Sequence, residues 1–436
     1  MDLHLKYNAT YMGNTMIFES FAESLSFFLW STFIISVILG AIVNKTNFCT
    51  MGAVSDMVNM SDYGRFRAWL LAIAVAILGV SVLEYMGLLS VSDSFPNYRG
   101  SQFIYVENIL GGILFGIGMT YASGCGNKTL IRIGGGNIKS ILVFIIIALI
   151  AYYMTTPFPN SDKTLYSVLF YDWVNPLAIT LDGNQDIGAL IGGEDNTGMM
   201  RLIAGLVVAA GMLFYIFKSA DFRSSRDNIL AGIAIGLIIL AAWYISSNIG
   251  VNADDSDYSL GDYYAEWDML AESDEGKPAT GRTLGTQSFT FINPIGQTYG
   301  YIKDGFDPAL LTFGLVSVFG VILGSLLWSL ISRSFRIEWF VDLKDFLNHF
   351  IGAILMGFGG VLALGCTIGQ GITGMSTLAL GSIISFLSIV FGSAMTMKIQ
   401  YYKLCYEDEA TFAKAFITAL VDMKLLPSSM RKLDAI

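Results

Sequence analysis

Charged residues are scarce in this sequence. They make up 14% of the 436 residues, whereas soluble domains carry about 25%. A soluble protein with so little charge would expose its apolar core to water, so the composition excludes an ordinary soluble domain. Hydrophobic residues make up 54% and mean hydropathy is +0.59. These values predict that a lipid bilayer solvates much of the chain.

Histidine and cysteine are also rare, with two and four residues. The sequence has no CxxC pair, and His4 and His349 do not fall at zinc-site spacing, so we expect no metal site. The pattern G-x-x-x-x-G-K-[ST], which would indicate ATP binding, is missing as well. The net charge of -10 argues against a nucleic-acid partner. We expect no cofactor.

Long apolar runs are what the sequence does contain. A membrane helix needs roughly 20 mostly apolar residues. Nine candidate spans are present, at 24–43, 67–90, 107–122, 138–155, 200–218, 228–248, 309–331, 350–364 and 377–396. We therefore expect an all-α polytopic membrane protein surrounded by lipid. No cleavable signal peptide is expected, because the N-terminus lacks a basic region and the first apolar run is long enough to span.

Basic residues are distributed unevenly between the loops. Lys45, Arg65 and Arg67 lie between the first two spans, and further Lys and Arg residues lie in every second loop after them. Cytoplasmic loops of membrane proteins carry an excess of Lys and Arg. With nine spans, this bias predicts that the N-terminus is outside and the C-terminus is cytoplasmic.

Loop composition divides the chain into four expected regions. They are a membrane half over 1–248, an acidic extracytoplasmic loop over 249–308, a second membrane half over 309–398 and a cytoplasmic segment over 399–436. Nine carboxylates and no basic residue occur between Asp254 and Glu275, which is typical of a solvated loop. In the last region, Phe412 and Phe416 have the spacing of an amphipathic helix, and we interpret Cys405 as structural.

Two glycine-rich segments repeat each other. GGILFGIGMTYASGCG (111–126) resembles GAILMGFGGVLALGCT (352–367) at a constant offset of 241 residues, which aligns Cys125 with Cys366. The third and eighth spans, which hold these segments, should cross the membrane in opposite directions. This predicts an internal inverted repeat, whose broken helices build a substrate site near the midplane. A fainter, gapped similarity relates 37–49 to 321–336.

Glycine flanks the cysteine at the end of both repeated runs. Glycine adopts backbone dihedrals that other residues avoid, and irregular backbone at membrane depth is tolerated only where it is buried in protein or lines a cavity. We therefore expect broken, re-entrant segments whose helix N-termini favour an anion. The alternative is that these glycines only allow close helix packing.

Three cysteines, Cys49, Cys125 and Cys366, fall at comparable ends of apolar spans. A thiol is a weak donor and a weak acceptor, and an apolar surrounding favours its neutral form. A series of thiols could therefore pass a soft anion onward without trapping it. The alternatives are that a buried cysteine serves as a small hydrophobic residue, or that two of them form a disulfide.

Residues beside two of these cysteines complete the candidate substrate-binding site. They are Gly124, Gly126, Asn127 and Lys128 around Cys125, and Gly365, Thr367 and Gln370 around Cys366. The polar side chains could bind an oxyanion or cap helix ends. Lys128, Arg132 and Arg336 would attract an anion, or would only set the topology. Asp56 and Glu84 are candidates for a proton relay.

The segments FCTMGAVSDMV (48–58), GIGMTYASGCG (116–126) and GFGGVLALGCTIGQGI (357–372) resemble the YeeE/YedE family of sulfur transport proteins. The resemblance covers about 25–396. It implies a transporter, not an enzyme, that takes up thiosulfate across the bacterial inner membrane through an hourglass-shaped bundle. It also implies that Cys49, Cys125 and Cys366 relay the anion, and that a cytoplasmic sulfur-carrier protein could receive it.

Two other functions stay open at this stage. The chain could transport another solute, for example a selenium species, without using its thiols. It could instead be a membrane thiol relay enzyme, although no histidine lies near any cysteine in the sequence to activate a thiol. The chain is longer than compact family members, with inserts at 156–199 and 249–308, and the acidic insert would repel an anion near the mouth of a path.

Overall fold

The computed structural model describes residues 9–12, 15–253, 256–270 and 284–434 of the chain. Within these ranges, nine helices or helix pairs are long and apolar enough to cross a membrane. Each of the nine expected spans falls on one of them, so the predicted all-α polytopic fold is confirmed. Part of the acidic run, at 254–255 and 271–275, lies outside the described residues.

The long helices form the body of the molecule. They are α1 (Phe21–Thr46), α3 (Gly64–Tyr85), α4 (Tyr105–Tyr121), α6 (Ile138–Thr155), α8 (Ile187–Phe217), α10 (Arg226–Ser247), α14 (Phe313–Ile331), α15 (Leu343–Leu362) and α16 (Leu380–Tyr406). Gly193 has a φ of 61° and kinks α8, so the part of α8 that is long enough to span begins at Asp195.

Short elements connect the long helices. The short α-helices are α2 (Thr50–Asn59), α5 (Gly126–Gly134), α7 (Asp172–Val174), α9 (Ala220–Ser224), α11 (Leu260–Ala265), α12 (Trp267–Leu270), α13 (Ile292–Lys303) and α17 (Phe412–Asp422). Two π-helices, η1 (Ser167–Tyr171) and η5 (Gly369–Gly374), and four 3-10 turns, η2 (Asn175–Leu177), η4 (Pro308–Leu310), η6 (Glu407–Glu409) and η7 (Ser428–Met430), are also present.

Side chains fix the beginnings of several membrane helices. Asn137 accepts a hydrogen bond from the amide of Ser140 at the start of α6 (3.0 Å), and Thr312 accepts one from the amide of Leu315 at the start of α14 (3.0 Å). The first amides of a helix have no partner inside the helix. These caps satisfy one of them in each case and set where the helix begins.

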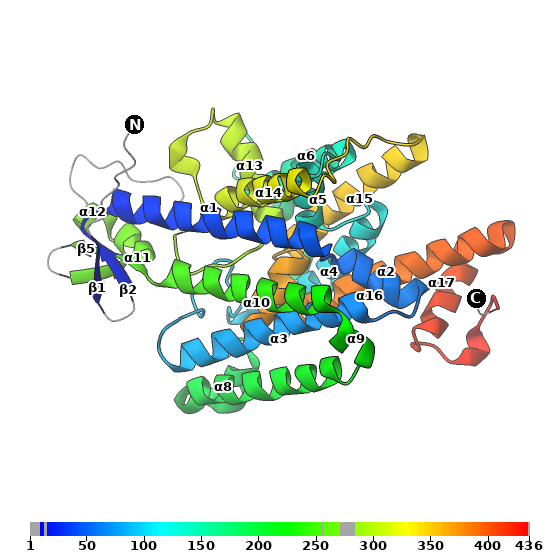
Figure 1. Cartoon of the computed structure of the whole chain (residues 1–436), viewed down its shortest axis with the longest axis horizontal. Helices are drawn as coiled ribbons and strands as arrows, with labels where there is room; N and C mark the ends of the chain where they lie inside the picture. The colour runs from blue at the N-terminus through cyan, green and yellow to red at the C-terminus, as the bar shows by residue number, and fades with distance from the viewer. Residues whose placement is uncertain (1–8, 13–14, 254–255, 271–283, 435–436) are drawn as a thin grey trace.

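The molecule is elongated along its helices, with a small sheet at one end and α17 at the other (Figure 1). The sheet has the order β1 (Ala9–Met12), β2 (Thr15–Phe18), β5 (Ile249–Ala253), β6 (Ser256–Ser259), and β2 and β5 are parallel. Strands β3 (Gln102–Phe103) and β4 (Ile179–Thr180) form a separate antiparallel pair. Because β2 leads into α1 and β5 follows α10, these two helices run in opposite directions. We call the two ends of the molecule the sheet end and the α17 end.

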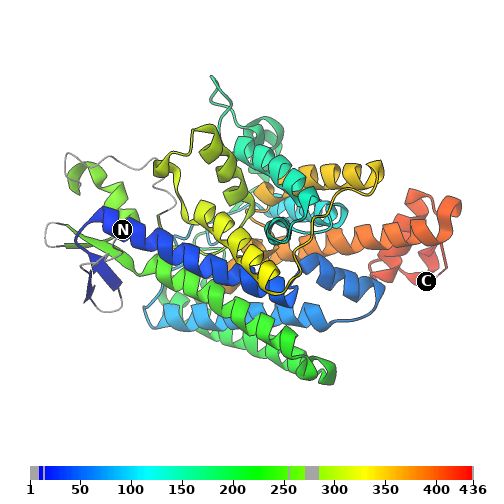
Figure 2. The same ribbon diagram turned by 45° about the horizontal axis from the view of Figure 1, so that its top comes forward.

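The contacts between helices come in matching pairs. Helix α1 packs against α14 (Figure 2), and α10 packs against α3. In the same way, the contact of α4 with α16 matches that of α15 with α6. The contact of α6 with α13 matches that of α16 with α2, and the contact of α5 with α14 matches that of η5 with α3. These contacts stay the same when α1, α2, α3, α4, α5 and α6 are exchanged, in that order, with α10, α13, α14, α15, η5 and α16. The inverted repeat stays a prediction, but such a repeat would produce this pattern.

The gapped similarity between 37–49 and 321–336 does not follow this exchange. It would pair α1 with α14, whereas the contacts pair α1 with α10 and α3 with α14. The two segments are side by side in space, since α1 and α14 pack along each other. Under this exchange the two segments are therefore not equivalent positions.

Helices α4 and α15 touch backbone to backbone near the centre. A Cβ added to Gly118 would lie 2.6 Å from the oxygen of Gly352, and one added to Gly111 would lie 2.5 Å from the nitrogen of Ala363. Only glycine permits so close an approach, which is the small-residue packing found between membrane helices. At these positions the glycines allow close helix packing, which is the alternative that the sequence left open.

The range 249–308, expected as one solvated loop, is divided in the structure. Phe289, Phe291 and Ile292 are fully buried, and α13, which follows them, packs against α6. The physical reason is the apolar sequence SFTFINPIG (288–296), which is too hydrophobic to remain in water. The second half of this range therefore belongs to the body of the bundle.

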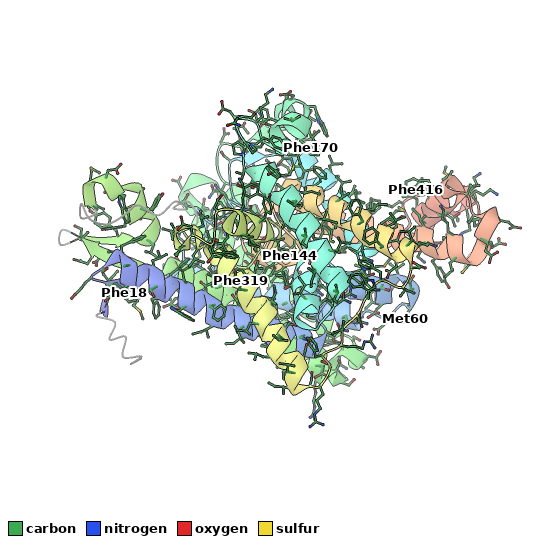
Figure 3. The ribbon with its side chains drawn as sticks, turned by 90° about the horizontal axis from the view of Figure 1, so that it is seen from above. Phe18, Met60, Phe144, Phe170, Phe319 and Phe416 are labelled. Carbon is green, nitrogen blue, oxygen red and sulfur yellow. The ribbon has the colours of Figure 1, made fainter. Side chains whose placement is uncertain are left out.

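The outer faces of the bundle and of α17 carry apolar side chains. Phe319 of α14 is 41% exposed, as expected for a helix that faces lipid (Figure 3). In α17, Ala415 and Ala419 pack inward, whereas Phe412 and Phe416 lie on the open side of the helix. The predicted helix is therefore present, but the aromatic side of it is not the side that packs.

Candidate functional site

The two Gly-Cys breaks have the same backbone. Helix α4 is followed by Ser123 with a φ of 57°, and α15 by Leu364 with a φ of 56°. The next amide, of Gly124 or Gly365, donates to a carbonyl five residues earlier over 2.8 Å. This is the Schellman arrangement that ends helices. The left-handed residues are thus Ser123 and Leu364. The sequence predicts the flanking glycines at this point, and in this respect the prediction is wrong.

The glycines beside the cysteines provide space. A Cβ added to Gly126 would lie 2.9 Å from Cδ1 of Ile292 and 3.8 Å from Cβ of Cys366. A Cβ added to Gly365 would lie 3.1 Å from Oγ1 of Thr290. Segments from both halves of the chain therefore meet closely at this point, and glycine is what lets them do so.

Each of the three predicted cysteines begins a short helix. Cys49 and Cys125 are the N-caps of α2 and α5. The sulfur of Cys49 accepts from the amide of Gly52, and that of Cys366 from the amide of Gly369, each over 3.5 Å. The N-terminus of a helix carries free N–H groups and the positive end of its dipole. Three such ends at the cysteines favour an anionic ligand.

The three cysteines are buried free thiols that form a series. Their exposed fractions are 6% for Cys49, 2% for Cys125 and 0% for Cys366. Cys49 and Cys366 are both neighbours of Cys125, so we place Cys125 in the middle. The hydroxyl of Thr367 faces the Cys125 thiol. Cys405 is different, since it is exposed at the end of α16.

Buried polar atoms without a hydrogen-bond partner surround this series. Seven of the nine such atoms in the described part of the chain are Thr50 Oγ1, Tyr98 Oη, Asn127 Oδ1, Thr290 Oγ1, Thr367 Oγ1, Gln370 Oε1 and Ser382 Oγ. A buried polar group left without a partner costs about 1–3 kcal/mol. A cluster of them is expected where water or a polar ligand completes the hydrogen bonds.

Two cavities approach the cysteines from opposite ends of the molecule. The larger, of about 430 Å³, lies toward the α17 end and is lined by Asn44, Asn47, Lys128, Arg132, Arg336 and Glu338, among others. The smaller, of about 60 Å³, lies toward the sheet end and is lined by Asn97, Tyr98, Gln102, Glu107, Asn108, Gln185, Gln370 and Ser382, among others. We call them the basic cavity and the amide cavity.

The basic cavity has an excess of positive charge. Lys128 Nζ donates to Oδ1 of Asn47 over 2.7 Å, and no carboxylate of the described ranges lies within ion-pair distance of Lys128 or Arg132. Arg336 pairs with Glu338 and holds the pKa of that carboxyl below its usual range, so the two charges cancel. The uncompensated cations attract anions to this cavity.

The amide cavity has one acidic side chain, Glu107, in an otherwise uncharged lining. Glu107 is 7% exposed and its carboxylate accepts a hydrogen bond from the hydroxyl of Tyr166. Burial and this hydrogen bond raise the pKa of Tyr166, so its hydroxyl stays protonated and remains a donor. The remaining polar lining consists of amide and hydroxyl groups, which can replace the water around an anion without trapping it by charge.

The two carboxylates considered for a proton relay are held in ion pairs. Asp56 pairs with Arg65 over 2.6 Å. Glu84 pairs with Arg99 over 2.6 Å and with Arg201 over 3.3 Å. Each carboxylate therefore has a structural role in an ion pair, and a part in a proton relay stays a prediction.

Glu84 belongs to a buried network of four charges. Arg201 also pairs with Asp186 over 2.7 Å, and Arg99 Nε donates to the carbonyl of Thr377 over 2.9 Å. Arg99 is 1% exposed and Asp186 is 0% exposed. The network is electrically balanced, and it fixes the loop that carries Tyr98 against the segment that follows η5.

The structure brings all predicted site residues into one region. Cys49, Cys125, Cys366, Gly124, Gly126, Asn127, Lys128, Gly365, Thr367 and Gln370 lie between or along the two cavities. Sequence reasoning missed Tyr98 and Thr290. The signal for Thr290 was present, since the offset of 241 also aligns Phe48–Cys49 with Phe289–Thr290. No local pattern singles out Tyr98, which lies in a loop.

Comparisons with known proteins find relatives over most of the chain. A family model described as sulphur transport matches residues 45–395, which include the three buried cysteines. The chain is 26% identical over 377 residues to the thiosulfate transporter TsuA of Escherichia coli (strain K12), covering 83% of this chain and 92% of that protein. It is 22% identical over 374 residues to the protein of the same name from Spirochaeta thermophila, covering 84% and 97%.

Proposed function

The chain belongs to the sulphur transport (YeeE/YedE) family, and on that premise we propose that it carries thiosulfate, or a related small sulfur-containing anion, through a central path of thiols. As a member of this family it is a membrane transporter and not an enzyme. The observation that carries the proposal is the series of buried thiols Cys366, Cys125 and Cys49 at helix N-termini, between the two cavities.

Thiols suit an anion that has a soft sulfur atom as well as oxygen atoms. A neutral S–H donates weakly and its sulfur accepts weakly, so each thiol holds the anion loosely. Transport needs binding that is favourable enough to admit the anion and weak enough to release it. The N–H groups of α2 and α5 and the hydroxyl of Thr367 supply stronger hydrogen bonds to the oxygen atoms between thiols.

We further propose the direction of the path. The basic loops lie at the α17 end, so the positive-inside rule places that end in the cytoplasm and the N-terminus outside, in the inner membrane of a bacterium. The anion then enters at the amide cavity, passes Cys366, Cys125 and Cys49, and leaves by the basic cavity. A cytoplasmic sulfur-carrier protein would receive it there.

Uptake into proteoliposomes tests the proposal. The purified full chain should take up radiolabelled thiosulfate in a saturable manner, and unlabelled thiosulfate should compete better than sulfate, sulfite or selenite. Thiosulfate differs from sulfate in having a soft terminal sulfur atom, and the thiols are the groups that would contact this atom. Transport of selenite or sulfate with no uptake of thiosulfate would show that the path serves another solute.

Replacement of Lys128 should weaken uptake in a salt-dependent manner. We expect Lys128→Met to lower the rate of uptake at low salt about tenfold, because a hydrogen bond to a charged group contributes roughly 1.5–3 kcal/mol. The difference from the unmodified protein should narrow at high salt, which screens the remaining cations.

Lys403→Met is the matched control for this change. Lys403 lies near the end of α16, where its ammonium lies over the ring of Phe412 and away from the basic cavity. Its replacement should leave uptake unchanged at either salt concentration. Equal losses in Lys128→Met and Lys403→Met would mean that the cations act only through overall charge or membrane topology.

A further inference from the structure

Thr290 occupies in the second half of the chain the place that Cys49 occupies in the first. The offset that aligns Cys125 with Cys366 also aligns Cys49 with Thr290. The fold gives the same pairing independently, since Cys49 immediately precedes α2, Thr290 lies just before α13, and α2 and α13 are exchanged in the matching helix contacts. The series of three thiols therefore has a fourth equivalent position, and that position carries a hydroxyl.

Thr290 is held against the break that contains Cys366. Its Oγ1 would lie 3.1 Å from a Cβ added to Gly365 and 2.4 Å from one added to Gly369. The amide of Gly369 is the group that donates to the sulfur of Cys366. The hydroxyl of Thr290 and the thiol of Cys366 thus flank the same short stretch of backbone.

The hydroxyl of Thr290 is buried and makes no hydrogen bond of normal geometry with the described residues. Thr290 is 8% exposed and Tyr98 is 3% exposed. The Tyr98 hydroxyl faces Thr290 and also lies near Cys366, and neither hydroxyl makes a hydrogen bond of normal geometry with the described residues. Tyr98 also lines the amide cavity, beside Gln370. The two hydroxyls therefore stand between that cavity and the first thiol.

We propose that Thr290 and Tyr98 form a fourth binding position on the path, at which hydroxyl groups bind the oxygen atoms of the anion before its sulfur reaches Cys366. The inference rests on the proposed transport of a sulfur anion along the thiols and extends it, because it names a group that selects among anions. Hydroxyl groups donate hydrogen bonds to the oxygen atoms of the anion, and thiols hold its sulfur atom loosely. An anion that carries both oxygen and sulfur would therefore pass the hydroxyl position and the thiols most easily.

The two halves differ in chemistry in a way that fits this role. At the offset of 241, Lys128 near Cys49 corresponds to Gly369 near Thr290. The first half therefore pairs a thiol with an ammonium, and the second pairs a hydroxyl with a glycine that carries no charge. Beside Tyr98, the guanidinium of Arg99 is already held by Glu84 and Asp186, so an anion that enters from the amide cavity loses its water without an uncompensated cation nearby. Neutral hydroxyl donors are then the groups that compensate for the lost water.

Three variants of the full chain test the proposal in proteoliposomes. Thr290→Val removes the hydroxyl and keeps the shape, Thr290→Ser keeps the hydroxyl, and Thr396→Val removes a buried hydroxyl that bonds within its own helix. Loss of one neutral hydrogen bond should raise the thiosulfate concentration at half-maximal uptake roughly five- to tenfold in Thr290→Val. We expect a change of less than about twofold in Thr290→Ser and in Thr396→Val.

A double-variant cycle adds a readout that a purely structural role would not move. Tyr98→Phe should raise the half-maximal concentration by a similar factor, and the Thr290→Val, Tyr98→Phe pair should raise it by less than the product of the two. An unchanged half-maximal concentration in Thr290→Val, or equal loss of uptake in Thr290→Val and Thr290→Ser, overturns the fourth position. Cys125→Ser is measured in parallel to distinguish failure of the fourth position from failure of the proposed function. Normal uptake in Cys125→Ser contradicts the proposed function itself.

Discussion

Replacement of Cys366 by serine is expected to lower thiosulfate uptake about a hundredfold, which corresponds to about 2.7 kcal/mol. Serine is smaller than cysteine and is a strong helix N-cap. The sulfur of Cys366 lies 3.5 Å from the amide of Gly369, whereas a serine oxygen would bond to that amide at about 3 Å. The hydroxyl would therefore serve the helix instead of the anion, and the series of thiols would be interrupted.

Cys405→Ser is the control for this result. Cys405 has the same chemistry but is exposed at the end of α16, away from both cavities, and its replacement should leave uptake unchanged. Cys125→Ser should behave like Cys366→Ser, because Cys125 lies in the middle of the series. Thermal unfolding in detergent should show that all three variants stay folded. Wild-type rates in Cys366→Ser and Cys125→Ser would mean that the anion passes without using the thiols.

Replacement of Arg99 by methionine should lower the free energy of unfolding by about 3–5 kcal/mol, the range observed when one partner of a buried ion pair is removed. Arg99 is 1% exposed and its partner Glu84 is 12% exposed. In the variant, Arg201 would be the remaining guanidinium for both Glu84 and Asp186. The carbonyl of Thr377 would also lose its donor. Denaturant or thermal unfolding of the purified protein measures the change.

Arg336→Met provides the comparison for Arg99→Met. Arg336 also pairs with a carboxylate, Glu338, but the side chains of this pair are 78% and 39% exposed. An exposed ion pair contributes at most about 1 kcal/mol, so this variant should unfold almost like the unmodified protein. If the two variants are destabilised equally, burial of the network does not determine its contribution.

The membrane fold could be predicted from the sequence because hydropathy is a local property. Each of the nine predicted spans falls on a helix of the described part of the chain. The two Gly-Cys segments could be predicted because a rare cysteine recurs at a fixed offset within similar glycine-rich runs. Charge composition assigned 288–296 to the acidic loop, whereas this apolar stretch, which is too short to span, is buried in the bundle. A loop assignment by charge alone does not resolve such a stretch inside an acidic range.

The parts of the site that were not predicted depend on distant contacts. Arg99 and Asp186 are ordinary charged residues of loops in the sequence, and only the folded chain shows that they form a buried pair of ion pairs with Glu84 and Arg201. Tyr98 is brought to Thr290 by the same network. The left-handed conformations at Ser123 and Leu364 were missed for another reason, since neither residue type favours that conformation and the helix end imposes it.

The β2–β5 ladder has a mechanical consequence. It hydrogen-bonds the strand before α1 to the strand after α10 over three residue pairs, and neighbouring strands keep a spacing of about 4.8 Å. At the sheet end these two helices are therefore clamped together, whereas at their other ends the described residues form no such strand pairing. If the two halves rock against each other, this clamp acts as a fulcrum. The amplitude then grows with distance from it and is largest at the α17 end, where the basic cavity lies.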